Sequence, residues 1–147
     1  MRVTILAVGH KMPSWIQEGF IEYTRRMPPE VRVELVELKP GRDKNEEGKR
    51  MLEAVPEGAT LLALDERGKA VTTQGLSVML SEWMREASHP TFAIGGAEGH
   101  SDEVKQRAAK LISLSALTLP HQLVRVVVAE QLYRAWTILA RHPYHRE

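Results

Sequence analysis

A glycine-rich hexapeptide is the first segment of this sequence whose residue types could do chemistry. Ile94-Gly95-Gly96-Ala97-Glu98-Gly99 follows an apolar run of strand length. Glycines at the end of a buried strand let the backbone approach a ligand, and the start of a following helix offers free N–H groups. The spacing matches neither the dinucleotide-binding G-x-G-x-x-G pattern nor a P-loop. Two interpretations remain open from the spacing, a ligand-binding turn and a plain tight turn between strand and helix.

A second segment, Leu114 to His121, is unusually apolar for its position between a strand and a helix. It reads Leu-Ser-Ala-Leu-Thr-Leu-Pro-His. An apolar loop buries either its own side chains or a partly apolar ligand. The segment is therefore either a loop folded into the core or one wall of a binding site.

The helix expected over Leu123–Arg141 has a narrow polar stripe and a wide apolar arc. The stripe consists of Glu130, Gln131, Arg134, Thr137 and Arg141. The arc spans roughly 200°, more than the ~100° that one core face needs, so we expect the helix to pack on its own sheet and on a second subunit. Arg125 projects from this arc and must be paired if it is buried. A structural ion pair and a role in an active site or subunit interface are both compatible with its position.

The chain ends in a short cationic and aromatic tail, residues 142–147. Pro143 ends the helix, and Tyr144, His145 and Arg146 follow it. Such residues suit stacking on a base and contacting phosphate, although chain termini are often inert. Residues 111–147 hold four arginines and three of the six histidines against two acids. This local excess, and not the net charge of +1, is what would attract a phosphate backbone.

We expect no metal site. The chain has no cysteine, which excludes disulfides, thiolate zinc sites and a cysteine nucleophile. His10, His89 and His100 do not show the spacing of metal ligands. Asp65-Glu66 fits turn chemistry better than a catalytic carboxylate pair, and the arginines within residues 25–50 fit solvated faces.

Apolar runs of strand length alternate with helical patterns, and these elements must position the residues above. The expected strands are Arg2–Val8, Val31–Leu38, Thr60–Leu64, Thr91–Ile94 and Leu111–Leu114. The turn Asp65–Gly68 is expected to end the third of them. The expected core stripe of the first helix is Trp15, Ile16, Gly19, Phe20 and Tyr23. The alternation predicts an α/β domain with a mostly parallel sheet and helices on both faces.

The length of 147 residues predicts one domain, residues 1–147. No apolar run approaches the ~18–20 residues of a membrane span, so we expect no membrane association. The first strand is not followed by a signal-peptide cleavage pattern. The composition therefore fits a cytoplasmic protein.

Several segments together resemble the methyltransferase H family of ribosomal RNA large subunit methyltransferases, which is part of the SPOUT superfamily. The resemblance runs from the first strand to the end of the chain. It rests on Val8–Pro13, Leu64-Asp65, Ile94–Gly99, Leu114–His121, Leu123–Val126, Glu130–Trp136 and His142–Arg146. Ala97 and Gln122 depart from it, because proline is common at both positions in that family.

The resemblance implies a SPOUT fold with a C-terminal trefoil knot that binds S-adenosylmethionine, and a homodimer. It implies methylation at N3 of a pseudouridine in helix 69 of 23S rRNA, on assembled ribosomes. General topology rules would argue against a knot. No separate RNA-binding domain is implied, which agrees with the length of the chain.

The same resemblance implies the site residues. The cofactor would be held by Leu64, Gly95, Leu114, Ser115, Ala116, Leu117, Thr118 and Leu119. The catalytic residues on the RNA side would be His121, Tyr144, His145 and Arg146. Two other classes compete with a methyltransferase: an RNA-binding protein without chemistry, and a small-molecule nucleotide-binding α/β protein. Cofactor binding separates the methyltransferase from the first, and loss of function without the tail separates it from the second.

Overall fold

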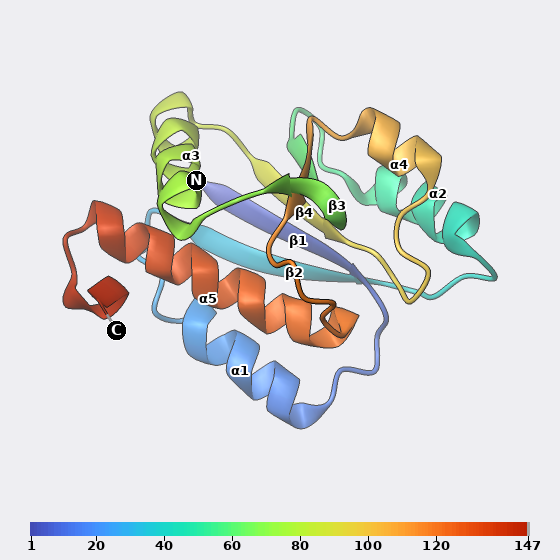
Figure 1. Ribbon diagram of the computed structural model, residues 1–147, viewed down its shortest axis with the longest axis horizontal. Coiled ribbons are helices and arrows are strands. Elements are labelled where there is room, and N and C mark those ends of the chain that lie inside the picture. The colour runs from blue at the N-terminus through green and yellow to red at the C-terminus, as the bar shows by residue number, and fades with distance from the viewer. Residues whose placement is uncertain (147) are drawn as a thin grey trace.

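The computed structural model describes residues 1–146, which form one five-stranded sheet flanked by helices (Figure 1). The strands are β1 (Arg2–Val8), β2 (Arg32–Leu38), β3 (Thr60–Ala70), β4 (Pro90–Ile94) and β5 (Lys110–Ser113). The helices are α1 (Ser14–Thr24), α2 (Lys44–Ala54), α3 (Thr73–Glu86), α4 (Asp102–Arg107), α5 (His121–Leu139) and the 3₁₀ turn η1 (Pro143–Arg146). The strand order is β2-β1-β4-β3-β5, and every pairing is parallel. This confirms the predicted fold class.

Helices cover both faces of the sheet, so the strands need apolar side chains on both sides. In β1, Val3, Ile5 and Ala7 face the cluster that includes residues of α1, α3 and α5. Leu6 and Val8 face the opposite cluster, which α2 and α4 complete. Figure 1 shows the same division, with α1, α3 and α5 on one side and α2 and α4 on the other. The continuous apolar run of β1 is therefore explained by burial on both faces.

The expected end of the third strand at Asp65–Gly68 is wrong. A hydrogen bond typical of a turn is present, since the Arg67 N–H donates to Asp65 Oδ1 at 2.8 Å. The strand nevertheless continues to Ala70, because β3 pairs with β5 on both sides of this segment. Leu64 and Lys69 both lie opposite Ile112, so the residues between them form an unpaired excursion. A Cβ on Gly68 would lie 2.6 Å from the Leu111 carbonyl carbon, so only glycine fits there.

The apolar arc of α5 is largely occupied within one chain. α5 lies over the sheet between α1 and α3 (Figure 1), and Val128, Leu132 and Ala135 are buried in the cluster shared by these helices. Our sequence argument for a second subunit from the width of this arc is therefore weaker than expected. In α1, Ile16 and Phe20 are buried as predicted, but Trp15 is 62% exposed, which corrects its place on the core stripe.

The chain reverses direction after α5. The helix ends at Leu139, and Arg141 has a left-handed φ of 57°. The His142 N–H donates to the Thr137 carbonyl at 2.8 Å, which closes the end of the helix. The reversal brings η1 back alongside α5 instead of letting the tail extend (Figure 1). Among the described residues, no helix is long and apolar enough to cross a membrane.

Candidate active site

A cleft of about 380 Å³ opens at the carboxyl ends of β3, β4 and β5. Parallel α/β sheets bind ligands at this edge, and the volume lies within the ~300–1,000 Å³ range of small-molecule sites. Among the residues predicted from the sequence, those that line it are Leu64, Gly95, Leu114, Ser115, Leu117, Thr118, Leu119 and His121. Ala116 does not line it. The sheet thus brings together three segments that are far apart in the sequence.

The glycine turn after β4 folds back on itself. The Gly99 N–H donates to the Gly96 carbonyl at 3.0 Å, and Gly99 has a φ of +80°. A Cβ on Gly95 would lie 2.8 Å from the Gly99 carbonyl carbon. The sequence argument assigned this glycine to close approach of a ligand, whereas the turn itself already excludes a side chain at that position.

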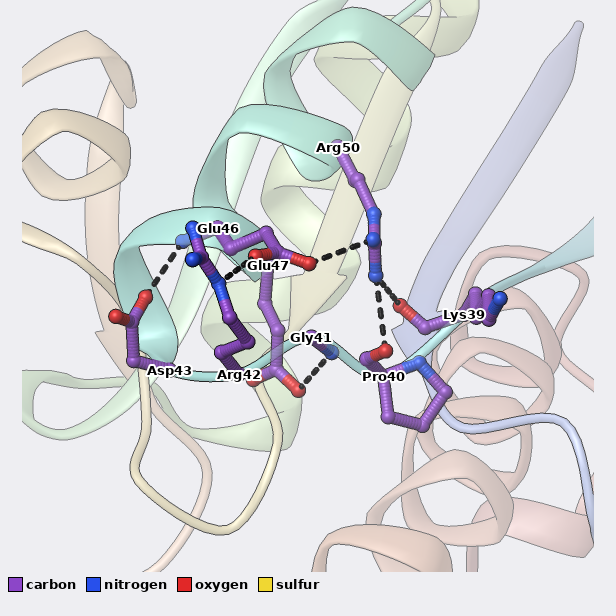
Figure 2. A network of polar contacts seen from close by, with 8 residues as sticks. All are labelled: Lys39, Pro40, Gly41, Arg42, Asp43, Glu46, Glu47 and Arg50. Atoms are coloured by element: carbon purple, nitrogen blue, oxygen red, sulfur yellow. Dashed lines mark hydrogen bonds and ion pairs between the residues drawn. The ribbon is translucent and has the colours of Figure 1, made fainter.

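A polar network supports the same turn from the side of α2. Figure 2 shows how Arg50 closes the loop after β2 by donating to the carbonyls of Lys39 and Pro40, each at 2.9 Å. Glu47 Oε2 accepts from the Gly41 N–H at 3.1 Å. The other carboxylate oxygen of Glu47 lies 2.8 Å from the place of a Cβ on Gly96. Glu47 therefore bonds to the loop after β2 and fills the space that a side chain on Gly96 would need.

The arginines of this network are paired within the chain. Arg42 and Arg50 both bond to Glu46, at 2.6 Å and 2.7 Å, and Asp43 caps α2 by accepting from the Glu46 N–H at 2.9 Å (Figure 2). This pairing, at the start of α2 and in the residues just before it, agrees with the interpretation of the arginines in residues 42–50 as part of a solvated face.

The loop between β5 and α5 forms the apolar wall of the cleft. The Leu117 N–H donates to Ser115 Oγ at 2.9 Å, and the Thr118 hydroxyl donates to Glu66 Oε2 at 3.1 Å. Leu117 is 74% exposed even though it is a large apolar residue. The loop is therefore not simply folded into the core, because Leu117 remains available to cover a ligand.

Charged residues surround the cleft, and our sequence reasoning assigned none of them to the site. They are Lys44, Asp65, Glu66, Arg67, Glu98 and Lys105. Burial alone would raise the pKa of the Asp65 carboxyl, but the Arg67 N–H and the Lys105 ammonium, 3.6 Å away, hold it below its usual range. Asp65 to Arg67 directly follow the buried part of β3, so the carboxyl-end rule could have found them.

His100 lies beneath the cleft and was also missed as a site residue. Its Nε2 is 3.0 Å from the Ala93 carbonyl oxygen, and the side chain is buried. Burial lowers the pKa of this imidazole below its ordinary 6.5, against the opposing effect of the Ala93 carbonyl. The ring is therefore neutral at pH 7. It links the end of the glycine turn to β4 through its contact with the Ala93 carbonyl.

This burial predicts a loss of stability in weak acid. The unfolded chain binds a proton on His100 near pH 6.5 but the folded protein does so only at lower pH, so the free energy of unfolding falls as pH drops below about 6.5. One such proton contributes a slope of up to ~1.4 kcal/mol per pH unit. His89 adds in the same direction, because burial and then Arg2 lower its pKa.

Denaturant unfolding from pH 7.5 to 5 measures this effect. His100→Gln should flatten the decline of stability with acid, whereas the same change at the exposed His10 should leave it as in the wild type. An equally steep decline in His100→Gln would show that its burial does not control acid stability.

Arg125 is buried and paired within its own chain. It is 0% exposed, and its Nη1 lies 2.7 Å from Glu37 Oε2. Its Nη2 donates to the Gly9 carbonyl at 2.8 Å. The structural ion pair that the sequence left open is therefore present, joining the first turns of α5 to the carboxyl ends of β1 and β2.

In the tail, Tyr144 packs against α5, and neither Tyr144 nor His145 lines the cleft of its own chain. The Tyr144 hydroxyl donates to Glu130 Oε2 at 2.8 Å. Glu130 is nine residues after His121, or ~14 Å along the helix axis. Among the described tail residues, Tyr144 and His145 are absent from the cleft lining. The Arg146 side chain and Glu147 lie outside the described residues. The structure of one chain thus gathers the predicted cofactor residues other than Ala116, together with His121, but not Tyr144 or His145.

Metal-binding chemistry has no obvious location in this fold. No group of three or more histidine, aspartate or glutamate side chains with metal-site geometry occurs in the part of the chain that the structure describes.

Comparison with known proteins adds two findings. A family model described as "Predicted SPOUT methyltransferase" matches residues 1–145. The chain is 52% identical to the ribosomal RNA large subunit methyltransferase H of Ralstonia pickettii and also 52% identical to that of Burkholderia lata. It is 50% identical to the protein of the same name from Ralstonia nicotianae. Each comparison covers 99% of this chain and 99% of the relative.

Proposed function

The chain belongs to the SPOUT methyltransferase family, and we propose that it methylates N3 of a pseudouridine in helix 69 of 23S rRNA, using S-adenosylmethionine. The observation that supports this most is the cleft: three strand ends converge there, and nearly every residue assigned to the cofactor from the sequence lines it. The name shared by the relatives points to ribosomal RNA of the large subunit. The nucleotide and the atom come from the resemblance in the sequence.

The residues of the cleft fit the proposed cofactor. Leu64, Leu114 and Leu119 offer apolar walls for an adenine ring, with loop amides for its polar edge. At the rim, Asp65 and Glu98 suit an ammonium group, and Lys44 suits a carboxylate. The exposed Leu117 can close over the bound molecule.

The proposed active site is composite, which requires a homodimer. Because the tail packs ~14 Å from the start of α5, the tail that carries Tyr144, His145 and Arg146 would serve the cleft of a second copy. Large apolar side chains are exposed on the α1 and α5 layer, namely Trp15, Ile21 and Leu139. These residues now support a dimer through α1 and α5 better than the width of the α5 arc does.

When bound, S-adenosylmethionine supplies a methyl group on a sulfonium that is already activated, so positioning and removal of one proton supply most of what the reaction needs. Leu64, Leu114 and Leu119 would hold the cofactor so that its methyl group could pass from sulfur to N3 as N3 loses its proton. The N3 proton passes to an imidazole nitrogen of the protein. His121 on the cleft wall and His145 on the tail are the two candidates for this base. We propose no role for a metal ion.

The trefoil knot and a cytoplasmic location are parts of the same proposal. The knot would hold the 114–119 loop rigidly against the glycine turn. A cytoplasmic location follows from a ribosomal substrate.

Methyl transfer from labelled S-adenosylmethionine to ribosomes tests this function. We expect label in helix 69 of ribosomes that carry pseudouridine there, and at least ~100-fold less when uridine replaces it, as for a site that uses a substrate hydrogen-bonding group. Ribosome binding without cofactor binding or methyl transfer would support an RNA-binding protein instead. Label at another nucleotide would contradict the proposed substrate.

A further inference from the structure

Tyr144 is fully engaged by its own chain. Its hydroxyl donates to Glu130 Oε2 at 2.8 Å. Its ring centroid lies 4.7 Å from that of Tyr133, and the Arg134 guanidinium lies 4.8 Å from the Tyr144 ring centroid. A ring already in contact with an aromatic neighbour and a cation, with its hydroxyl bonded to a carboxylate, is poorly placed to stack on a substrate base.

Glu130 is itself held by several donors. It accepts from Arg134 Nε at 2.9 Å and from Gln131 Nε2 at 2.7 Å. Gln131 Oε1 in turn accepts from the Thr73 hydroxyl at the start of α3, at 2.7 Å. The acceptor of the Tyr144 hydroxyl is therefore fixed by two helices, which makes it a rigid anchoring point.

His145 differs from Tyr144 in this respect. Its Nδ1 is buried and has no hydrogen-bond partner among the described residues. The Tyr144 hydroxyl is satisfied by a hydrogen bond to α5, whereas the neighbouring His145 has a ring nitrogen that still needs a hydrogen-bond partner.

We infer that Tyr144 is a positioning residue: it anchors the tail to Glu130 so that His145 is presented to the substrate, and it does not contact the target base itself. This inference rests on the proposed function. It narrows the role expected for Tyr144 from the sequence. The contribution of Tyr144 to the reaction then passes mainly through the bond to Glu130, and not through contact with the base.

The protonation state of Tyr144 agrees with an anchoring role. Burial first, and then the hydrogen bond to Glu130, raise the pKa of its phenol above the ordinary value of 10.0. The hydroxyl therefore remains a donor throughout the working range of pH, and it does not act as a proton acceptor for N3.

A double-mutant cycle on kcat/KM tests the inference. Tyr144→Phe removes the hydroxyl but keeps the ring, and Glu130→Gln removes the charged acceptor. Each change should lower kcat about tenfold, as expected for a hydrogen bond to a charged group, with KM for ribosomes and cofactor affinity nearly unchanged. Because both break the same contact, the double variant should lose little more than either single one. Losses that multiply, or full activity in Tyr144→Phe with none in Tyr144→Ala, would overturn the inference.

A matched cycle controls for general weakening of the fold. Arg2→Gln removes an exposed pair with Glu34, 2.9 Å apart, at the far end of β1. Arg2→Gln by itself should leave the activity unchanged. The double variant Arg2→Gln with Tyr144→Phe should have the same activity as Tyr144→Phe.

Amide hydrogen exchange provides a readout independent of activity. Tyr144→Phe and Glu130→Gln should each speed exchange in residues 144–146 at least severalfold and leave the middle of α5 protected. Unchanged exchange in both variants would overturn the anchor. If the wild-type protein transfers no methyl group but its tail is released by these changes, the proposed function fails while the anchor stands.

Discussion

Removal of residues 144–147 is expected to abolish methyl transfer while leaving cofactor affinity within about twofold of the wild type. The described tail residues Tyr144 and His145 do not line the cleft of their own chain, so we expect their loss to remove no cofactor contact there. A general acid or base typically contributes ~10²–10⁴-fold, so the rate should fall by at least ~100-fold if the tail carries such groups or orients the substrate. Single-turnover transfer to ribosomes, together with calorimetry of cofactor binding, measures both quantities. Full activity in the truncated protein would contradict a composite site, and loss of cofactor binding would place the tail in the cofactor pocket.

A mixed dimer tests whether the tail acts across subunits. One chain carries Gly95→Val with an intact tail, and the other has an intact cleft but lacks residues 144–147. If sites are composite between chains, the intact cleft receives the intact tail, and the mixed dimer should show about half of the wild-type activity. If each chain completes its own site, both sites are defective and no activity remains. The two parent homodimers should be inactive in either case.

Gly95→Val is expected to weaken S-adenosylmethionine binding by at least ~100-fold in a protein that still folds. A Cβ at this position would meet the Gly99 carbonyl carbon at 2.8 Å and its oxygen at 2.9 Å. Because these are backbone atoms, the turn must open, and the cleft wall moves with it. The rest of the sheet does not depend on this turn. Calorimetry measures the cofactor affinity of the variant, and far-UV circular dichroism shows whether it still folds.

Gly19→Ala is the matched control for this substitution. A Cβ there would lie 3.4 Å from Val126 Cγ1, which is ordinary van der Waals contact. The Gly19→Ala variant should bind the cofactor with the affinity of the wild type. If Gly95→Val also binds normally, the turn is not part of the cofactor site.

Local sequence patterns determine most of the fold. The apolar run of β1 and its alternation with helical segments predicted a parallel sheet covered on both faces, because short-range periodicity reports which sides of a strand or helix are buried. Thr72 and Ser101 cap the starts of α3 and α4, since their hydroxyls accept from the Gly75 and Val104 N–H groups, and such hydroxyl residues mark helix starts in a sequence. The glycine turn and the 114–119 loop share a cleft because parallel strands end at one edge of the sheet.

Only the tertiary structure decided where the turn and tail residues lie. Asp65–Gly68 has the composition of a turn, but pairing with β5 carries β3 on to Ala70. The wide apolar arc of α5 suggested a second subunit, yet α1 and α3 cover much of it within one chain. Tyr144 reads as a free aromatic residue near the terminus, and only the reversal at Arg141 brings it to Glu130. These outcomes depend on contacts between residues distant in sequence or across a chain reversal, and local propensity carries no information about them.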